Sequence, residues 1–187
     1  MVSIPSLWLP ILLAASFVFI VSSIIHMVLP YHRSDFAKVP HEDEVMDALG
    51  KFNIPPGDYA VPRPGSSKEM STPEFQDKMK RGPVFFLTMR ESGVPGMGAS
   101  LLQWFLYSIV VGVFCAYLTG RAFTPGTDYL TIFRFAGTIA FVGYALALAQ
   151  TSIWYKRKWS TTLKSAFDSL LYACVTGGAF GWLWPPV

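Results

Sequence analysis

The chain has 187 residues, of which 52% are hydrophobic and only 14% are charged. An average soluble domain carries about 25% charged residues. The charges are also unevenly placed, because residues 31–98 hold 9 of the 15 lysines and arginines and 10 of the 12 acidic residues. This composition excludes an ordinary soluble enzyme, a disordered protein and a nucleic-acid-binding protein, and it indicates a membrane protein with one polar insert.

Four long apolar runs predict transmembrane helices, in residues 7–29, 101–118, 130–153 and 165–183. At about 1.5 Å per residue, such runs are long enough for a hydrocarbon core of about 30 Å. Backbone polar groups in lipid must bond within the chain, which favours helices for all four. The predicted fold is an all-α membrane protein with four transmembrane helices. Residues 1–30 and 99–187 supply the helices, and residues 31–98 form a small α+β cytoplasmic insert between the first two.

Basic residues indicate which loops face the cytoplasm. The 154–164 hairpin contains Lys156, Arg157 and Lys158, and cytoplasmic loops are enriched in such residues. We therefore expect a bacterial inner-membrane protein with residues 31–98 and 154–164 in the cytoplasm and both termini in the periplasm. All six tryptophans lie near predicted helix ends, where indole prefers the headgroup level. The expected outer belt is Trp8, Trp182 and Trp184, and the inner belt is Trp104, Trp154 and Trp159.

Small residues recur at every fourth position in two of the predicted helices. The first stripe is Gly112, Ala116 and Gly120, and the second is Ala173, Gly177 and Gly181. Helices in lipid approach closely where such residues remove side-chain bulk. We expect the 101–118 and 165–183 helices to cross at these stripes; alternatively, one stripe meets a partner protein.

The insert contains signals for two helices and two strands. Acidic residues after Pro40 predict a helix start, and residues 59–61 form a possible short strand. Thr72 and Pro73 predict a capped helix start, and residues 84–89 are the strongest strand prediction. A module of this size buries little apolar surface alone. We therefore expect it to contact the 156–164 hairpin, the membrane surface or a partner.

His26 is the one histidine inside a predicted span. It could ligate a haem or a chlorophyll-type pigment, or relay a proton. A bis-histidine haem needs a second intramembrane histidine, whereas a chlorophyll magnesium needs one axial ligand. The alternative is an interfacial histidine bonded to a carbonyl or to water. His26 is therefore the single candidate cofactor-binding residue, and no cofactor is required.

Other polar residues favour structural roles. Arg134 is expected to reach the outer interface, with Asp128 as a possible ion partner. Asp168 is expected at the start of the last helix, paired with Lys164. No chain of ionisable groups crosses the bilayer, which disfavours a pump or carrier.

The remaining candidates for chemistry give no site. The contiguous segment 41–44 (HEDE) is expected to be an acidic helix start, because its successive side chains point in different directions. Cys115 and Cys174 are expected to pack as small apolar groups without a disulfide. The sequence predicts no catalytic residue and no metal site.

Four segments of the chain resemble those of a group of bacterial four-helix inner-membrane proteins that has no assigned activity. They are SSIIHMVLPYHRSDF (22–36), PPGDY (55–59), GPVFFLT (82–88) and GWLWP (181–185). The likeness covers nearly the whole chain. It implies a bacterial origin and four helices, and it implies no catalytic residue.

Three function hypotheses follow. The first is a non-catalytic accessory subunit of a respiratory or photosynthetic type of membrane complex, with lipids and other subunits as partners and no nucleic acid. The second is a pigment- or haem-binding protein that uses His26. The third is an enzyme or sensor working through the insert, with a pocket lined by His41, Glu44 and Asp58.

Overall fold

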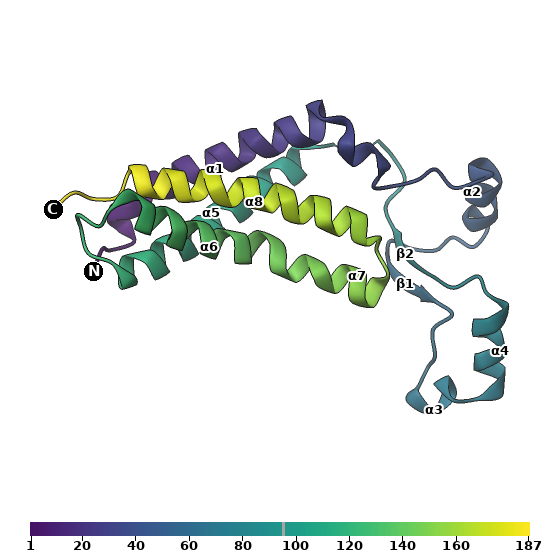
Figure 1. Cartoon of the computed structure of the whole chain (residues 1–187). Helices are drawn as coiled ribbons and strands as arrows, with labels where there is room; N and C mark the ends of the chain where they lie inside the picture. The colour runs from purple at the N-terminus through teal and green to yellow at the C-terminus, as the bar shows by residue number, and fades with distance from the viewer. Residues whose placement is uncertain (95) are drawn as a thin grey trace. The chain divides into compact units, whose positions relative to one another are not determined.

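The computed structural model describes residues 1–94 and 96–187. It is mostly helical (68%) and contains one small two-stranded sheet. The chain divides into a helical unit, made of residues 1–36 and 96–187, and an insert unit between these segments (Figure 1). Residues 31–36, which the sequence places in the insert, therefore belong to the helical unit.

The first helix of the helical unit changes its winding near its end. It begins with a 3-10 turn at Pro5–Leu7, continues as α1 (Trp8–Ser23) and ends in a π-helical turn at Ile24–Val28. The Leu29 N–H donates to the Ile24 carbonyl over five residues, at 3.2 Å. A 3-10 turn at Pro30–Ser34 follows, because Pro30 lacks the N–H that would continue the helix.

The other helices of this unit are α5 (Gly98–Ala122), α6 (Tyr129–Ala145), α7 (Ala149–Tyr155) and α8 (Trp159–Trp182). A 3-10 turn at Leu146–Leu148 joins α6 to α7. Figure 1 shows α8 lying alongside α1 and α6. Within the part of the chain that the structure describes, three helical stretches are long and apolar enough to cross a membrane: Pro5–Val28, Gly98–Ala122 and Tyr129–Tyr155.

The last helix, α8, begins six residues before the predicted run at 165. Its first turns are polar, and the sequence pattern excluded them for that reason. In the structure Thr161 and Thr162 are buried, and the hydroxyls of Thr162 and Ser152 are hydrogen-bonded at 2.6 Å. Asp168 consequently lies in the third turn of α8, not at its start.

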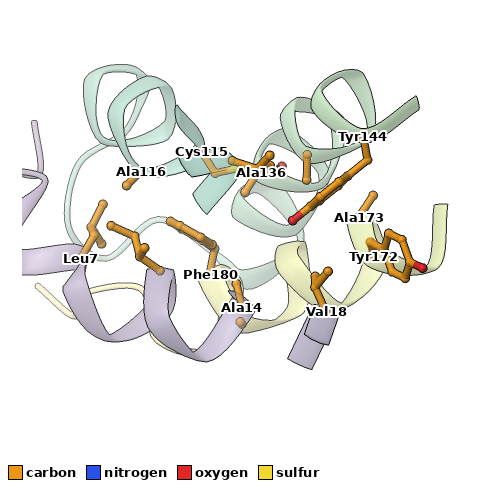
Figure 2. Packing of buried hydrophobic residues seen from close by; sticks show 14 of the residues in the cluster. Leu7, Ala14, Val18, Cys115, Ala116, Ala136, Tyr144, Tyr172, Ala173 and Phe180 are labelled. Atoms are coloured by element: carbon orange, nitrogen blue, oxygen red, sulfur yellow. Dashed lines mark hydrogen bonds between the residues drawn. The ribbon is translucent and has the colours of Figure 1, made fainter. Parts of the chain in front are cut away.

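The core of the helical unit combines small, branched aliphatic and aromatic residues from all four long helices. Figure 2 shows Phe180 of α8 between Ala14 of α1 and the side chains of Cys115 and Ala136, while Val18 of α1 lies toward Tyr172. Each of these side chains is buried. Small side chains allow helix backbones to approach closely, so the four helices share one core.

Both small-residue stripes lie at contacts between helices. Contrary to our expectation, however, the two stripes do not contact each other. A Cβ on Gly177 would lie 2.5 Å from the carbonyl oxygen of Phe133, so this stripe of α8 faces α6. A Cβ on Gly112 would meet Ile11, and one on Gly120 would clash with the Val2 carbonyl. The α5 stripe therefore faces α1 and the N-terminal segment, because these elements fill the space beside it.

Two of the tryptophans expected at a membrane interface also form hydrogen bonds within the helical unit. Trp184 is 8% exposed, and its indole N–H donates to the Thr124 carbonyl at 3.0 Å. Trp104 is partly buried, and its indole N–H donates to the Ser22 hydroxyl at 2.8 Å. The indole N–H needs an acceptor, and both find one within the protein. The exposed tryptophans are Trp8, Trp154, Trp159 and Trp182.

The insert unit contains the elements that its sequence predicts, with one additional short helix. In chain order it comprises α2 (Glu42–Gly50), β1 (Gly57–Val61), α3 (Ser67–Met70), α4 (Pro73–Arg81) and β2 (Phe85–Met89). The strands pair antiparallel, from Gly57 opposite Met89 to Val61 opposite Phe85. Thr72 caps α4 as predicted, because its hydroxyl accepts from the Phe75 N–H at 3.3 Å.

Replacing Gly177 with alanine is expected to destabilise the helical unit by about 1–3 kcal/mol, because the added methyl must displace the α6 backbone. Gly178→Ala is the matched control on the same helix, since its Cβ would lie 3.7 Å from the Tyr129 hydroxyl. Thermal unfolding in detergent measures both variants. Equal melting temperatures for the two would contradict the close packing of α6 and α8.

Candidate functional site

A cluster of polar side chains lies where the end of the first helix meets the first half of α8. The 24–28 π-turn contributes His26, the 30–34 turn contributes His32, and Asp35 follows directly. Lys164 and Asp168 lie one helical turn apart on α8. All of these residues belong to the helical unit, and we refer to them together as the His–Asp cluster.

His32 is at the centre of the His–Asp cluster. Its Nε2 lies 2.8 Å from Oδ2 of Asp168, and its Nδ1 lies 2.6 Å from Oδ2 of Asp35. Ionised carboxylates can only accept hydrogen bonds. Two such acceptors therefore favour a ring that carries protons on both nitrogens, which places a positive charge between two negative ones.

Asp168 is the most deeply buried charged group of the cluster, with 3% of its side chain exposed. Besides its contact with His32, its Oδ1 accepts a hydrogen bond from the Tyr31 hydroxyl. Burial, together with this bond to Asp168, raises the pKa of Tyr31. Tyr31 therefore remains a protonated donor throughout the neutral range, and both oxygens of Asp168 have a partner.

Lys164 connects α8 to the segment that follows the first helix. Its Nζ donates to the Tyr31 carbonyl at 2.5 Å, to the Ser34 hydroxyl at 2.8 Å and to Oδ1 of Asp35 at 3.0 Å. Burial acts to raise the pKa of Asp35, but the hydrogen bonds from His32 and Lys164 outweigh it and hold that pKa below its usual value. Asp35 is therefore ionised at neutral pH.

The cluster pairs two carboxyl groups with two basic groups. Asp35 and Asp168 supply the carboxyl groups, and Lys164 and the imidazole of His32 are their partners. A buried carboxylate needs such partners, because isolated charge in a low-dielectric interior is strongly disfavoured. The network thus joins the 30–34 turn to α8 at two points.

His26 completes the cluster from the π-turn. Its ring centroid lies 4.5 Å from that of His32, and its side chain is exposed. One ligand atom each from His26, His32 and Asp168 lies within 4.8 Å of the others. Single π-helical turns occur frequently at functional sites, where they change the direction of a side chain.

The structure brings together residues that the sequence analysis treated separately. Asp168 is paired with His32 and Tyr31, whereas the expected partner Lys164 binds Asp35 instead. A sequence signal existed: His32 and Asp35 are three residues apart after a helix-ending proline, a spacing at which side chains in a helical turn meet. The contact with Asp168, 136 residues away, had no such signal.

The other ionisable residues considered in the sequence lie apart from this cluster. Asp128 caps α6, where its Oδ1 accepts from the Thr131 N–H at 3.1 Å. The bond from Thr131 lowers the pKa of Asp128. Arg134 is exposed on α6, and among the described residues no ion pair joins it to Asp128. Both cysteines are free: Cys115 is buried and packs as expected, whereas Cys174 is exposed and does not.

The residues named for a pocket in the insert are exposed and make local pairs. His41 and Glu44 are paired at 3.0 Å, with 75% and 77% of their side chains exposed. Asp58 accepts instead from the Thr88 hydroxyl on the neighbouring strand, at 2.6 Å. This arrangement gives no support to the enzyme or sensor hypothesis.

Comparison of the chain with family models, curated proteins and solved structures gives no match. The function must therefore be argued from the exposed surfaces of the chain and from the chemistry of its polar cluster.

Asp168→Asn is expected to destabilise the helical unit by about 3–5 kcal/mol, because it breaks the buried ion pair between His32 and α8 and leaves only Asp35 as the carboxylate partner of His32. Asp77→Asn is the matched control: Asp77 forms an ion pair with Lys80 at 3.6 Å, but 76% of its side chain is exposed. That change should alter stability by less than about 1 kcal/mol. Thermal unfolding of both variants in detergent tests the difference, and a D168N melting curve that matches the D77N curve would refute it.

Proposed function

We propose that the chain is a four-span protein of a bacterial inner membrane and serves as a non-catalytic subunit of a larger membrane complex. The membrane part of this proposal is supported by the distribution of polarity in the helical unit. Large apolar side chains are exposed on every long helix, including Ile20, Leu106, Val142 and Leu170. Polar groups such as Ser108 and Thr176 are buried beside the apolar core of the helical unit. Such an arrangement suits a lipid solvent, because water would favour the reverse.

The fourth span is proposed to be α8, although it is less apolar than the other three. Its polar residues Thr161, Asp168 and Thr176 are buried against neighbouring helices. Its exposed positions include Leu163, Phe167, Leu170 and Trp182. A helix whose polar groups face the protein can present an apolar surface to lipid despite a modest mean hydropathy.

The position of the two termini at the same end of the helical unit supports an even number of spans. The Val2 N–H donates to the Gly120 carbonyl, and the Gly126 N–H donates to the Pro185 carbonyl, so both termini lie beside the turn between α5 and α6. Figure 1 shows them at one end of the helical unit, opposite the turn between α7 and α8. That turn carries Lys156, Arg157 and Lys158, which favours placing it in the cytoplasm and the termini in the periplasm.

Single-cysteine labelling tests this topology. In a Cys115→Ala, Cys174→Ala background, a membrane-impermeant maleimide is expected to label S3C in intact spheroplasts. The same reagent should label S92C and R157C only in inverted vesicles. Labelling of R157C from the periplasmic side would refute the proposed orientation.

The proposed role as a subunit rests on α2 of the insert unit, because none of the apolar side chains of this helix is buried. Phe52, just beyond the helix, is 72% exposed and follows Val45 by two turns, whereas Met46, 66% exposed, lies about 100° around the helix from Val45. Val45 is 36% exposed, and none of the residues of α2 is buried. Apolar groups gathered on one helix face outside a membrane are typical of a contact with another protein.

The negative charge of α2 favours another protein, and not a lipid surface, as the binding partner of its apolar residues. The helix carries four acidic residues and no lysine or arginine, in the sequence EDEVMDALG. Anionic headgroups would repel these carboxylates. We therefore propose that α2 docks on an apolar groove of another subunit, with basic residues at the rim of that groove.

Native electrophoresis after mild detergent extraction from the native membrane tests the subunit role. The wild-type chain is expected to migrate in an assembly well above 20.8 kDa. The double variant Val45→Asp, Phe52→Asp should release it, because both charges would enter the proposed interface. Val94→Asp is the control, since Val94 is fully exposed and lies outside α2. Migration of the wild type as a lone chain, or equal release by the control, would contradict the proposal.

A further inference from the structure

We propose that His26, His32 and Asp168 bind one divalent transition-metal ion of the Zn²⁺ class. The proposal rests on the converging ligand atoms at the end of the first helix. It holds whether or not the chain is a subunit of a complex, because none of these residues belongs to α2 or to the insert unit.

The distances within the cluster are close to those that a small ion requires. Zinc binds imidazole nitrogen at about 2.0–2.1 Å and carboxylate oxygen at about 2.0–2.2 Å, which puts neighbouring tetrahedral ligand atoms about 3.3 Å apart. Nε2 of His32 and Oδ2 of Asp168 are 2.8 Å apart, and all three ligand atoms lie within 4.8 Å of one another. A small opening of the first pair and a rotation of the exposed His26 ring would therefore create the site.

Two partners of the ligands already have the orientation that metal sites use. Asp35 contacts Nδ1 of His32 and so leaves Nε2 directed at Asp168, like the carboxylate that orients a zinc-bound histidine. The Tyr31 hydroxyl occupies Oδ1 of Asp168 and leaves Oδ2 for the ion. Lys164 in turn holds Asp35 at 3.0 Å. Each of these outer contacts limits the rotation of a ligand before the ion arrives.

The ion would take the place of one proton. The proton on Nε2 of His32, which now lies between the ring and Asp168, leaves to solvent, and the nitrogen lone pair binds the metal. Nδ1 keeps its proton and its bond to Asp35. Three protein ligands leave a further coordination position for water or for a group from a partner.

The donor set selects the class of ion. Two imidazoles and one carboxylate suit Zn²⁺ and related ions such as Co²⁺, whereas Mg²⁺ and Ca²⁺ prefer an all-oxygen environment. A haem held between the two histidines does not fit, because their ring centroids are only 4.5 Å apart and leave no space for a macrocycle. The sequence analysis predicted no metal site, since it considered His26 without the residues that the fold brings beside it.

Cobalt and zinc titration of the full-length chain, purified in detergent without a polyhistidine tag, tests the site. We expect one Co²⁺ per chain, with a visible ligand-field absorption that Zn²⁺ removes and Mg²⁺ does not. His26→Gln should weaken binding at least tenfold. This variant should still fold, because the side chain is exposed and its ring contacts His32 without a hydrogen bond. Asp168→Asn should also weaken binding wherever its melting curve shows that it folds.

His41→Gln is the matched control, because His41 is the third histidine of the chain and lies in the exposed pair with Glu44. It should retain the Co²⁺ affinity and stoichiometry of the wild type. No Co²⁺ absorption in the wild-type chain would overturn the proposal. So would unchanged binding in H26Q, or a loss in H41Q as large as that in H26Q. These results are separate from the electrophoresis of the α2 variants, so the two proposals can fail independently.

Discussion

The helical unit depends on the burial of the Asp168 carboxylate between its helices. A buried carboxylate needs hydrogen-bond donors around it. The two oxygens of Asp168 contact Tyr31 and His32, which lie on the segment that leaves the first helix. Removing charge from water is strongly unfavourable unless partners compensate for it. The 30–34 turn is therefore held against α8, and with it the point at which the chain leaves the helices for the insert.

The remaining helices of the helical unit are held together mainly by the close approach of their backbones at small residues. Gly177 brings α8 against the α6 backbone, and Gly112 brings α5 against α1. For helices that cross a membrane, as proposed here, hydrophobic burial contributes little to their association, so surface complementarity and buried hydrogen bonds have to hold them. In keeping with this, the indole N–H groups of Trp104 and Trp184 donate to acceptors within the helical unit.

The two proposals concern different surfaces and complement each other. The acidic, apolar face of α2 offers a contact for another protein outside the membrane. The His–Asp cluster offers an ion-binding position at the end of the helices, where a bound ion would join the first helix to α8. An ion at this position would strengthen the junction that leads into the insert, and its open coordination position would remain available to a neighbouring group.

The sequence by itself determined the membrane-type helices, the two-stranded insert and the Thr72 cap, because hydropathy and capping depend on residues that are close along the chain. The sequence also predicted that the small residues lie at helix contacts. It did not predict which helices they contact, since a stripe on one helix does not specify which backbone will face it. Only the tertiary structure decided that Asp168 meets His32 and not Lys164, and that His26 joins them. The contact between His32 and Asp168 connects residues 136 positions apart, and no local pattern encodes which helices become neighbours.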